Sequence, residues 1–321
     1  MIPPFVLSLS YLVAASCFIL GLKWLGNPAT ARQGNRISAL GMLIAVVVTL
    51  FDRAILSYEI IIAGILVGGI IGVAMARMVK MTSMPEMVAL LNGFGGAASM
   101  LVGGAEFLRS ELVGEHLPLN TEITIQLSVL IGAVTFSGSL IAFAKLQELM
   151  SGRPFLFPMQ KPLNMALLGV IAALAVYQIA TFEPHHWPFY AVVALSLLLG
   201  VLIVIPIGGA DMPVVIALLN SLSGLAAAMT GFVINNPVLI ISGALVGSSG
   251  LILTRIMSKA MNRSIANVFF SGFGAVAAGN GKRSAEGLTV RRTTADDLAI
   301  QLAYARLVII VPGYGMAVAQ A

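Results

Sequence analysis

Two asparagines stand inside long apolar stretches, Asn92 in "MPEMVALLNGFGGAASMLVGG" and Asn220 in "MPVVIALLNSLSGLAAAMTGF". A polar side chain inside a membrane is costly unless it finds partners, and such residues are functional candidates by default. Serines and small residues surround both amides, so together they could hold a file of water for protons or ions. An amide does not ionise, so either asparagine would orient water rather than carry the proton. Hydrogen bonding between neighbouring helices is the structural alternative, and the sequence leaves both open.

A second cluster of candidate residues lies further along the chain. Gly243, Gly247 and Gly250 recur at i, i+4 and i+7, which places them on one face of a helix. A bare helix face allows close packing against a neighbour, and it also allows a helix to shift or rotate. Ser248 stands beside this face.

The end of the sequence indicates a different chemistry. The apolar run 307–311 precedes "PGYGMAV", and a β-branched run followed by Gly-x-Gly-x-x-Val is typical of a strand and a phosphate-binding turn. Upstream, Thr294 is the expected N-cap of a short helix from Asp296 to about Ala305. The strand and turn predict a nucleotide phosphate site, whose candidate residues are Gly313, Tyr314, Gly315, Met316, Ala317 and Val318.

Other kinds of site are disfavoured by composition. The chain has one cysteine, Cys17, so neither an intrachain disulfide nor a metal cluster of thiolates can form, and we expect no metal site. The formal net charge is +5, but no basic patch with interleaved aromatic residues is present. We therefore do not expect nucleic-acid binding.

Long apolar segments must position these candidates. Of the 321 residues, 59% are hydrophobic and 10% are charged, which indicates a membrane protein. Nine stretches are long enough, or nearly so, to cross a hydrocarbon core of about 30 Å. They are expected near 4–25, 37–51, 59–76, 85–106, 123–144, 163–182, 188–207, 212–233 and 237–256.

Lysines and arginines predict the orientation of these segments, because short cytoplasmic loops collect them. Basic residues follow the odd-numbered spans one, three, five and nine: Lys23, Arg32, Arg36, Arg77, Lys80, Lys145, Arg153, Lys161, Arg255, Lys259 and Arg263. The loops of the opposite side hold only Arg53 and Arg109. We expect the N-terminus outside and the C-terminus in the cytoplasm.

The two asparagines belong to an internal repeat. Met84-Pro85 and Met212-Pro213 open segments that share the pattern MPxxxALLNxxxGxAxxxxG at a spacing of 128 residues, and both start on the predicted cytoplasmic side. A weaker match joins "IGAVTFSGSLI" (131–141) to "SGALVGSSGLI" (242–252). Ser83 and Asp211 stand where N-caps are expected, and Ser83 with Glu86 has the spacing of a capping box.

These patterns give a fold class and three regions. We expect an all-α membrane protein of about nine transmembrane helices with a parallel internal repeat, followed by the start of a Rossmann-like α/β domain. The transmembrane domain, with the candidate proton or ion path, would occupy 1–264. A linker rich in glycine, alanine, serine and basic residues would follow at 265–293, and the first part of a nucleotide-binding domain at 294–321.

Several long motifs resemble one family. "MPEMVALLNGFGG", "TFSGSLIAFAKL", "GGADMPVVIALLNSLSG", "GALVGSSG", "KAMNRS" and "PGYGMAVAQA" are similar, in order, to the β subunit of proton-translocating NAD(P) transhydrogenase. The resemblance covers nearly the whole chain. It implies hydride transfer from NADH to NADP+ coupled to proton movement across the bacterial inner membrane.

The resemblance also implies partners and site residues. An α subunit would supply the NAD(H) domain, and the present chain would supply the NADP(H) domain. The assembly would be a dimer of alpha-beta units in a lipid bilayer. Asp211, Gly208 and Gly209 would lie where the membrane and NADP(H) domains meet, and Gly243, Gly247 and Gly250 on a coupling helix. Gly313 to Val318 would bind the NADP(H) pyrophosphate, and protons would move along the helices that hold Asn92, Asn220 and Ser248. Hydride passes directly between two nicotinamides, so no catalytic side chain is expected.

Two features depart from the family pattern. Some members have a histidine at the position of Asn92, so the titrating group would lie elsewhere. The sequence stops at Ala321, early in the expected NADP(H) domain, and we expect this chain alone to be inactive. A secondary transporter or channel subunit built on the parallel repeat is the alternative function, and the Gly-x-Gly-x-x-Val segment argues against it.

Overall fold

A computed structural model describes residues 4–51, 58–114, 117–181, 186–261 and 294–309. The chain divides into two compact units, residues 1–275 and 276–321. The expected linker at 265–293 lies outside the described residues.

The first unit is a helical bundle, and its helices confirm the predicted spans. Nine helices of the described ranges are long and apolar enough to cross a membrane. They are α1 (Pro4–Leu25), α2 (Ala31–Leu50), α3 (Tyr58–Met78), α4 (Met84–Val113), α5 (Leu119–Leu146), α6 (Gln160–Ala180), α7 (His186–Val204), α8 (Met212–Val233) and α9 (Pro237–Ala260).

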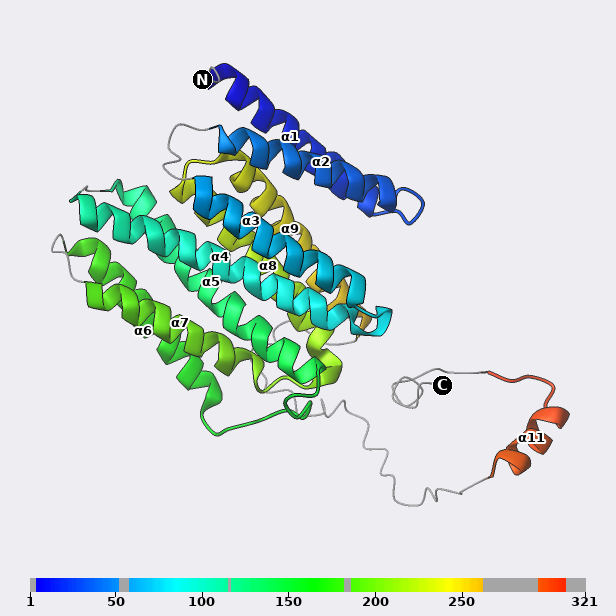
Figure 1. Cartoon of the computed structure of the whole chain (residues 1–321). Helices are drawn as coiled ribbons and strands as arrows, with labels where there is room; N and C mark the ends of the chain where they lie inside the picture. The colour runs from blue at the N-terminus through cyan, green and yellow to red at the C-terminus, as the bar shows by residue number, and fades with distance from the viewer. Residues whose placement is uncertain (1–3, 52–57, 115–116, 182–185, 262–293, 310–321) are drawn as a thin grey trace. The chain divides into compact units, whose positions relative to one another are not determined.

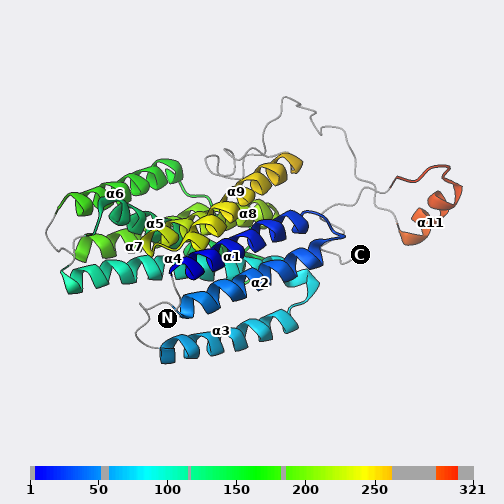
Figure 2. The same ribbon diagram turned by 90° about the horizontal axis from the view of Figure 1, so that it is seen from above.

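Three helices form the centre of this bundle. α4, α5 and α8 contact one another, and α5 and α8 bury the largest share of their apolar windows. α9 packs on α8 and contacts α1, which pairs with α2, while α7 packs on α5 and α6 on α7 (Figure 1). α3 buries none of its residues and lies at one edge of the bundle (Figure 2). The asparagine-bearing helices are therefore both central.

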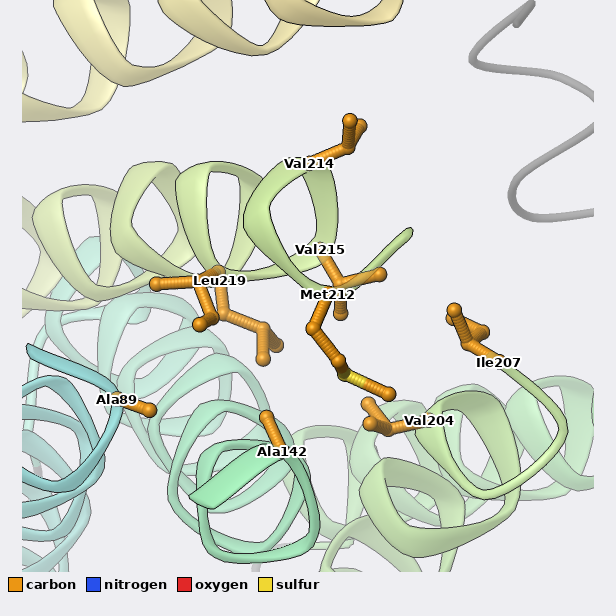
Figure 3. Packing of buried hydrophobic residues seen from close by; sticks show 9 residues of the cluster. Ala89, Ala142, Val204, Ile207, Met212, Val214, Val215 and Leu219 are labelled. Carbon is orange, nitrogen blue, oxygen red and sulfur yellow. The ribbon is translucent and has the colours of Figure 1, made fainter. Parts of the chain in front are cut away.

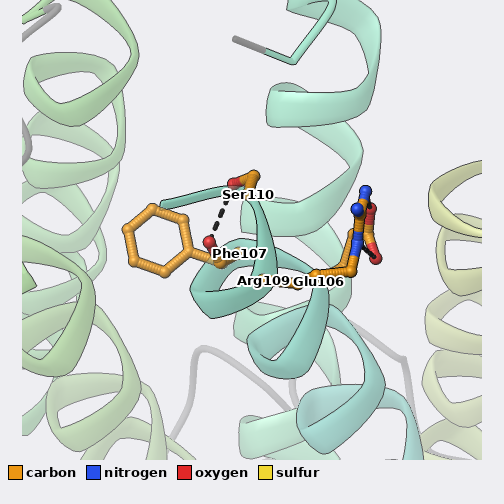
Figure 4. Close-up of polar contacts among 4 residues, drawn as sticks. All are labelled: Glu106, Phe107, Arg109 and Ser110. Carbon is orange, nitrogen blue, oxygen red and sulfur yellow. Dashed lines mark hydrogen bonds and ion pairs between the residues drawn. The ribbon is translucent and has the colours of Figure 1, made fainter. Parts of the chain in front are cut away.

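α2 and α4 extend furthest beyond their predicted spans. α2 begins at Ala31 and includes Arg32 and Arg36, and α4 continues past 106 to Val113. A helix backbone can continue through the membrane interface, because long basic side chains extend to the polar layer. Arg109 consequently lies in α4 rather than in a loop, and it pairs with Glu106 at 2.6 Å (Figure 4). Its charge is offset within the helix, so it weighs little in the orientation argument.

The internal repeat extends to the turns that precede α4 and α8. A short 3-10 turn at Met81–Ser83 leads into α4, and another at Gly209–Asp211 leads into α8, again 128 residues apart (209 − 81 = 128). A proline occupies the first turn of each helix, as predicted. The capping-box prediction is wrong. The Ser83 side chain accepts no hydrogen bond from the helix, and the Glu86 carboxylate instead accepts one from the Gln147 amide of the α5 C-cap.

A hydrophobic cluster closes one end of the bundle between α4, α5, α7 and α8. Met212, at the start of α8, is fully buried, and its side chain extends toward Val204 and Ala142 (Figure 3). The cluster also contains Ala89, Ile207, Val214, Val215, Ile216 and Leu219. This packing fixes the first turns of α8 against the ends of α5 and α7.

The described part of the second unit contains one helix, α11 (Ala295–Tyr304). Thr294 caps it by accepting a hydrogen bond from the Asp297 amide at 3.2 Å, which confirms the predicted helix start. The expected strand is not formed at residues 307–309, since a strand needs a partner and the described residues supply none. Residues 310–321, with the predicted phosphate turn, lie outside the described residues.

Candidate functional site

Asn92 forms a direct contact between α4 and α5. Its side chain is 8% exposed, and its Nδ2 donates to Ser139 Oγ at 2.9 Å. The amide oxygen of the same side chain is buried and has no hydrogen-bond partner within the described part of the chain. Asn92 lies eight residues into α4, about 12 Å along its axis. A polar pair with a spare acceptor is therefore present deep in the bundle.

A line of hydroxyl groups continues from this pair along α5. Thr135 lies one turn from Ser139, is fully buried, and its hydroxyl has no partner among the described residues. Two turns further, Ser128 Oγ bonds to Ser99 O of α4 at 3.0 Å and to Thr230 Oγ1 of α8 at 2.7 Å. From Ser139 to Ser128 the line covers about 16 Å, roughly half of a hydrocarbon core.

We call this line the α5 polar seam, formed by Asn92, Ser99, Ser128, Thr135, Ser139 and Thr230. Among these residues the sequence identified Asn92, with Ser99 as one of the small residues near it, and it did not identify the other four. The missed α5 residues do have a signal in the sequence. Ser128, Gly132, Thr135 and Ser139 are spaced at i, i+4, i+7 and i+11, which repeats the pattern that identified the α9 glycines. Small residues at this spacing place one face of α5 against α4.

The hydroxyls at the far end of the seam can rearrange their hydrogens. Ser128 and Thr230 share three hydrogen bonds, one between them and one each to Ser99 O and Ala226 O. Each hydroxyl carries a single hydrogen, so two hydrogens serve three bonds. At any moment only two of the three contacts are hydrogen bonds, so each hydroxyl can change its acceptor by rotation.

The second asparagine does not join this seam. Asn220 is half-buried on α8, and its side chain makes no hydrogen bond within the described ranges. The repeat explains the difference, because the residue of the second copy that corresponds to Ser139 is Gly250. The structure therefore separates two residues that the sequence treats as equivalent.

The α9 glycines face α8 at very short range. A Cβ added to Gly243 would lie 2.4 Å from Ala228 N and 2.7 Å from Gly224 O. Gly247 and Gly250 are also buried, and Ser221 Oγ of α8 donates to Gly247 O at 2.6 Å. Backbones this close leave no room for side chains, which confirms the close packing predicted from their spacing.

The same contact occurs in the first repeat. A Cβ added to Gly132 of α5 would lie 2.6 Å from Gly96 O and 2.9 Å from Met100 N of α4. Gly96 and Met100 are the counterparts of Gly224 and Ala228, since each pair differs by 128 residues. The α4 and α5 pair thus packs as the α8 and α9 pair does, through equivalent glycines.

Ser248 lies apart from both groups. Its side chain is exposed on α9, and its Oγ donates to Ala244 O of the same helix at 2.8 Å. α8 contacts the opposite, glycine-bearing face of α9. Within this chain Ser248 is not part of a line with Asn92.

Gly208, Gly209 and Asp211 lie together in the connection from α7 to α8. Gly209 N donates to Gly152 O of the α5 to α6 connection at 2.9 Å, and Asp211 is buried. A Cβ at Gly208 would lie 3.4 Å from Pro154 Cγ, and one at Gly209 3.7 Å from Gly152 O, both ordinary contacts. Packing among the described residues therefore does not require glycine at either position.

The remaining predicted sites can be stated briefly. Gly313, Tyr314, Gly315, Met316, Ala317 and Val318 lie outside the described residues. Across the described ranges no group of three or more histidine, cysteine, aspartate or glutamate side chains could hold a metal ion.

Comparison with known proteins identifies the family. A sequence model described as the NAD(P) transhydrogenase beta subunit matches residues 7–321. The chain belongs to the NAD(P) transhydrogenase beta-subunit family. Two curated relatives from Rhodospirillum rubrum, one from a specified strain, are named NAD(P) transhydrogenase subunit beta. Each is 47% identical over 319 residues, which cover 97% of this chain and 68% of the relative.

Membership of the transhydrogenase beta-subunit family decides between the two functions considered from the sequence. The match extends over the bundle and the residues that follow it, and nothing supports the transporter or channel alternative. With nine membrane-length helices in its described part, this family member is a multi-pass membrane protein.

Proposed function

We propose that this chain is the membrane subunit of a complex that transfers hydride between NADH and NADP+ and couples that transfer to proton translocation. The observation that carries the proposal is the family match over residues 7–321, including both repeats. An alpha subunit is the partner. NADP(H), which supplies or accepts the hydride when bound, belongs to the region of this chain after the bundle, and NAD(H) to the alpha subunit.

The proposed proton path follows the α5 polar seam. Amide and hydroxyl groups both donate and accept, so they can hold water molecules in line without being charged. Asn92 Oδ1 and Thr135 Oγ1 are spare buried groups on facing helices, and Ser128 with Thr230 continues the line. None of these groups titrates near neutral pH, so the titrating group belongs to another part of the complex.

For Asn220 and Ser248 we propose a path that is formed together with the partner subunit. Asn220 is half-buried in this chain, and Ser248 is exposed on the outer face of α9. We propose that helices of the alpha subunit cover these positions and complete a path there. The glycine contacts of Gly243, Gly247 and Gly250 would let α9 move relative to α8 during coupling.

Gly208, Gly209 and Asp211 are the proposed contact with the NADP(H) domain. Packing inside the described bundle does not explain glycine at 208 and 209, which supports a close approach by another domain. We propose the division 1–264, 265–293 and 294–321, with Gly313 to Val318 at the NADP(H) pyrophosphate. An outside N-terminus, a cytoplasmic C-terminus, the bacterial inner membrane and a dimer of alpha-beta units complete the proposal.

Asn92→Leu in the complete alpha-beta complex tests the path. Leucine is close in size to asparagine but removes both polar atoms, so it interrupts the seam without opening a cavity. We expect protons moved per hydride transferred, measured in proteoliposomes, to fall at least threefold while assembly is retained.

Gln126→Leu is the matched control. Gln126 is also a buried α5 amide, but it bonds to Gln178 of α6, away from the seam. It should leave the proton to hydride ratio unchanged. A normal ratio in Asn92→Leu would mean that Asn92 only joins α4 to α5. Absence of transhydrogenation in the wild-type complex would overturn the proposed function itself.

A further inference from the structure

Lys145 is a buried cation in the last turn of α5. Its residue is 4% exposed, and its Nζ donates to Ile205 O and, at 2.8 Å, to Ile207 O. From the sequence, Lys145 is expected in the loop after the fifth span, whereas in the structure it is buried in the last turn of α5. A lysine this buried needs hydrogen bonds for its ammonium group, since an unpaired buried charge is very costly.

The partners of Lys145 are backbone carbonyls. α7 ends at Val204, and Ile205 and Ile207 lie one and three residues later, so the ammonium group lies at the carbonyl end of that helix. Helix C-termini carry partial negative charge and favour a nearby cation. In the described part of the chain no carboxylate forms an ion pair with Lys145. The contact therefore fixes backbone positions rather than pairing two side chains.

The segment that Lys145 holds is the one that leads to Asp211. We call residues 205–211 the α7–α8 segment. Three polar contacts attach it to α5 and to the α5–α6 connection: the Lys145 bonds, Gly209 N to Gly152 O at 2.9 Å, and Phe155 N to Ile205 O at 3.5 Å. Ile207 and the following Met212 are buried in the hydrophobic cluster. Of the three, the Lys145 contact alone comes from a transmembrane helix.

α5 joins this segment to the polar seam. Ser139, the partner of Asn92, lies six residues before Lys145, about 9 Å along the helix axis. Ile207, the acceptor for Lys145, lies four residues before Asp211. One helix and the Lys145 hydrogen bonds therefore link the buried Asn92 pair to the segment that carries Gly208, Gly209 and Asp211, beside the hydrophobic cluster that contains both Ile207 and Ala142.

We propose that Lys145 is a positioning residue that passes a displacement of α5 to the α7–α8 segment. When the contents of the polar seam change and α5 moves, the ammonium group moves Ile205 and Ile207 with it. This inference rests on the proposed function, because it assigns Lys145 to the coupling step. A residue that only stabilised the end of α7 would affect stability without affecting coupling.

Lys145→Met in the complete alpha-beta complex is the first test. The variant keeps much of the aliphatic stem but cannot donate to the carbonyls. Hydride transfer without a proton gradient should stay within about twofold of wild type, while its acceleration by an imposed gradient in proteoliposomes should fall at least threefold. Lys161→Met, which removes an exposed lysine from the first turn of α6, should change neither quantity.

Lys145→Arg and Lys145→Gln distinguish positioning from simple stabilisation. Arginine keeps the charge and donors and should restore at least half of the gradient response. Glutamine has a shorter side chain and can satisfy fewer acceptors, so its response should fall at least twofold even if the methionine variant does not assemble. A wild-type gradient response in an assembled methionine or glutamine variant would overturn the inference, as would an arginine variant no better than methionine.

Hydrogen exchange separates this inference from the proposed function. In Lys145→Met, or in Lys145→Gln if methionine prevents assembly, the backbone amides of Ile207, Gly209 and Asp211 should exchange at least tenfold faster than in wild type. If the wild-type complex shows no gradient-dependent hydride transfer, the proposed function fails. The exchange result still decides whether Lys145 holds the segment, and unchanged exchange would refute that claim.

Discussion

Replacing Gly243 by alanine is expected to force α8 and α9 apart. The added Cβ would lie 2.4 Å from Ala228 N and 2.7 Å from Gly224 O, both backbone atoms that cannot rotate away. Ordinary contact begins near 3.4 Å, so the two helices must separate by about 1 Å locally (3.4 − 2.4 = 1.0). Overpacking of this kind costs about 1–3 kcal/mol, because every other contact along the interface loosens with the displaced backbone.

The internal repeat makes this prediction sharper. In Gly132→Ala the added Cβ would meet Gly96 O at 2.6 Å and Met100 N at 2.9 Å, the counterparts of the two atoms near Gly243. The two variants should therefore lose similar amounts of stability, although they lie on different helix pairs. A large difference between their losses of stability would show that the two copies of the repeat are similar in sequence but differ in packing energy.

The assay is unfolding of the purified protein in mixed micelles of increasing SDS content, followed by far-ultraviolet circular dichroism. Gly169→Ala is the control, since a Cβ there meets nothing within 4 Å and alanine favours the helix by up to about 1 kcal/mol. If Gly243→Ala and Gly132→Ala both unfold within about 0.5 kcal/mol of wild type, the close glycine contacts do not exist as described.

Two further substitutions test local interactions in the bundle. Ser139→Ala removes the acceptor for Asn92 Nδ2. Because the buried amide then lacks that partner, the free energy of unfolding should fall by about 1–3 kcal/mol in the same assay. A loss below about 0.5 kcal/mol would mean that the amide finds another partner. Asn236→Ala removes the N-cap of α9, whose Oδ1 accepts from Leu239 N at 3.1 Å, and should cost about 1 kcal/mol. The exposed Asn120, replaced by alanine, should change little, and an equal loss there would contradict the capping argument.

Much of the secondary structure could be predicted from local sequence. Apolar runs of about twenty residues must become helices in a membrane, because no water is present to satisfy the backbone. The predicted bounds of α1 and α8 agree with the structure, and Thr294 caps α11 as expected. Boundaries failed where helices continue past the hydrocarbon core, as at Arg36 and Arg109, because hydropathy does not report where a backbone stops.

Residues with long-range partners were harder to predict. The sequence identified Asn92 by its polarity but could not show that Ser139, 47 residues later, would accept its hydrogen bond. It treated Asn220 as equivalent, although the second repeat has Gly250 where the first has Ser139. It placed Lys145 in the loop after the fifth span, because local charge patterns do not reveal that carbonyls 60 and 62 residues later would accept hydrogen bonds from the ammonium group.

Sequence alone determined the membrane class, the predicted spans, the repeat and the resemblance to the transhydrogenase family. These properties depend on composition and on patterns along the chain, which folding does not alter. Tertiary structure decided which polar residues meet, that Ser248 lies on an outer face, and that α3 buries none of its side chains within the described bundle. Those outcomes depend on which helix faces come together, because a side chain deep in a membrane obtains its partners from neighbouring helices rather than from water.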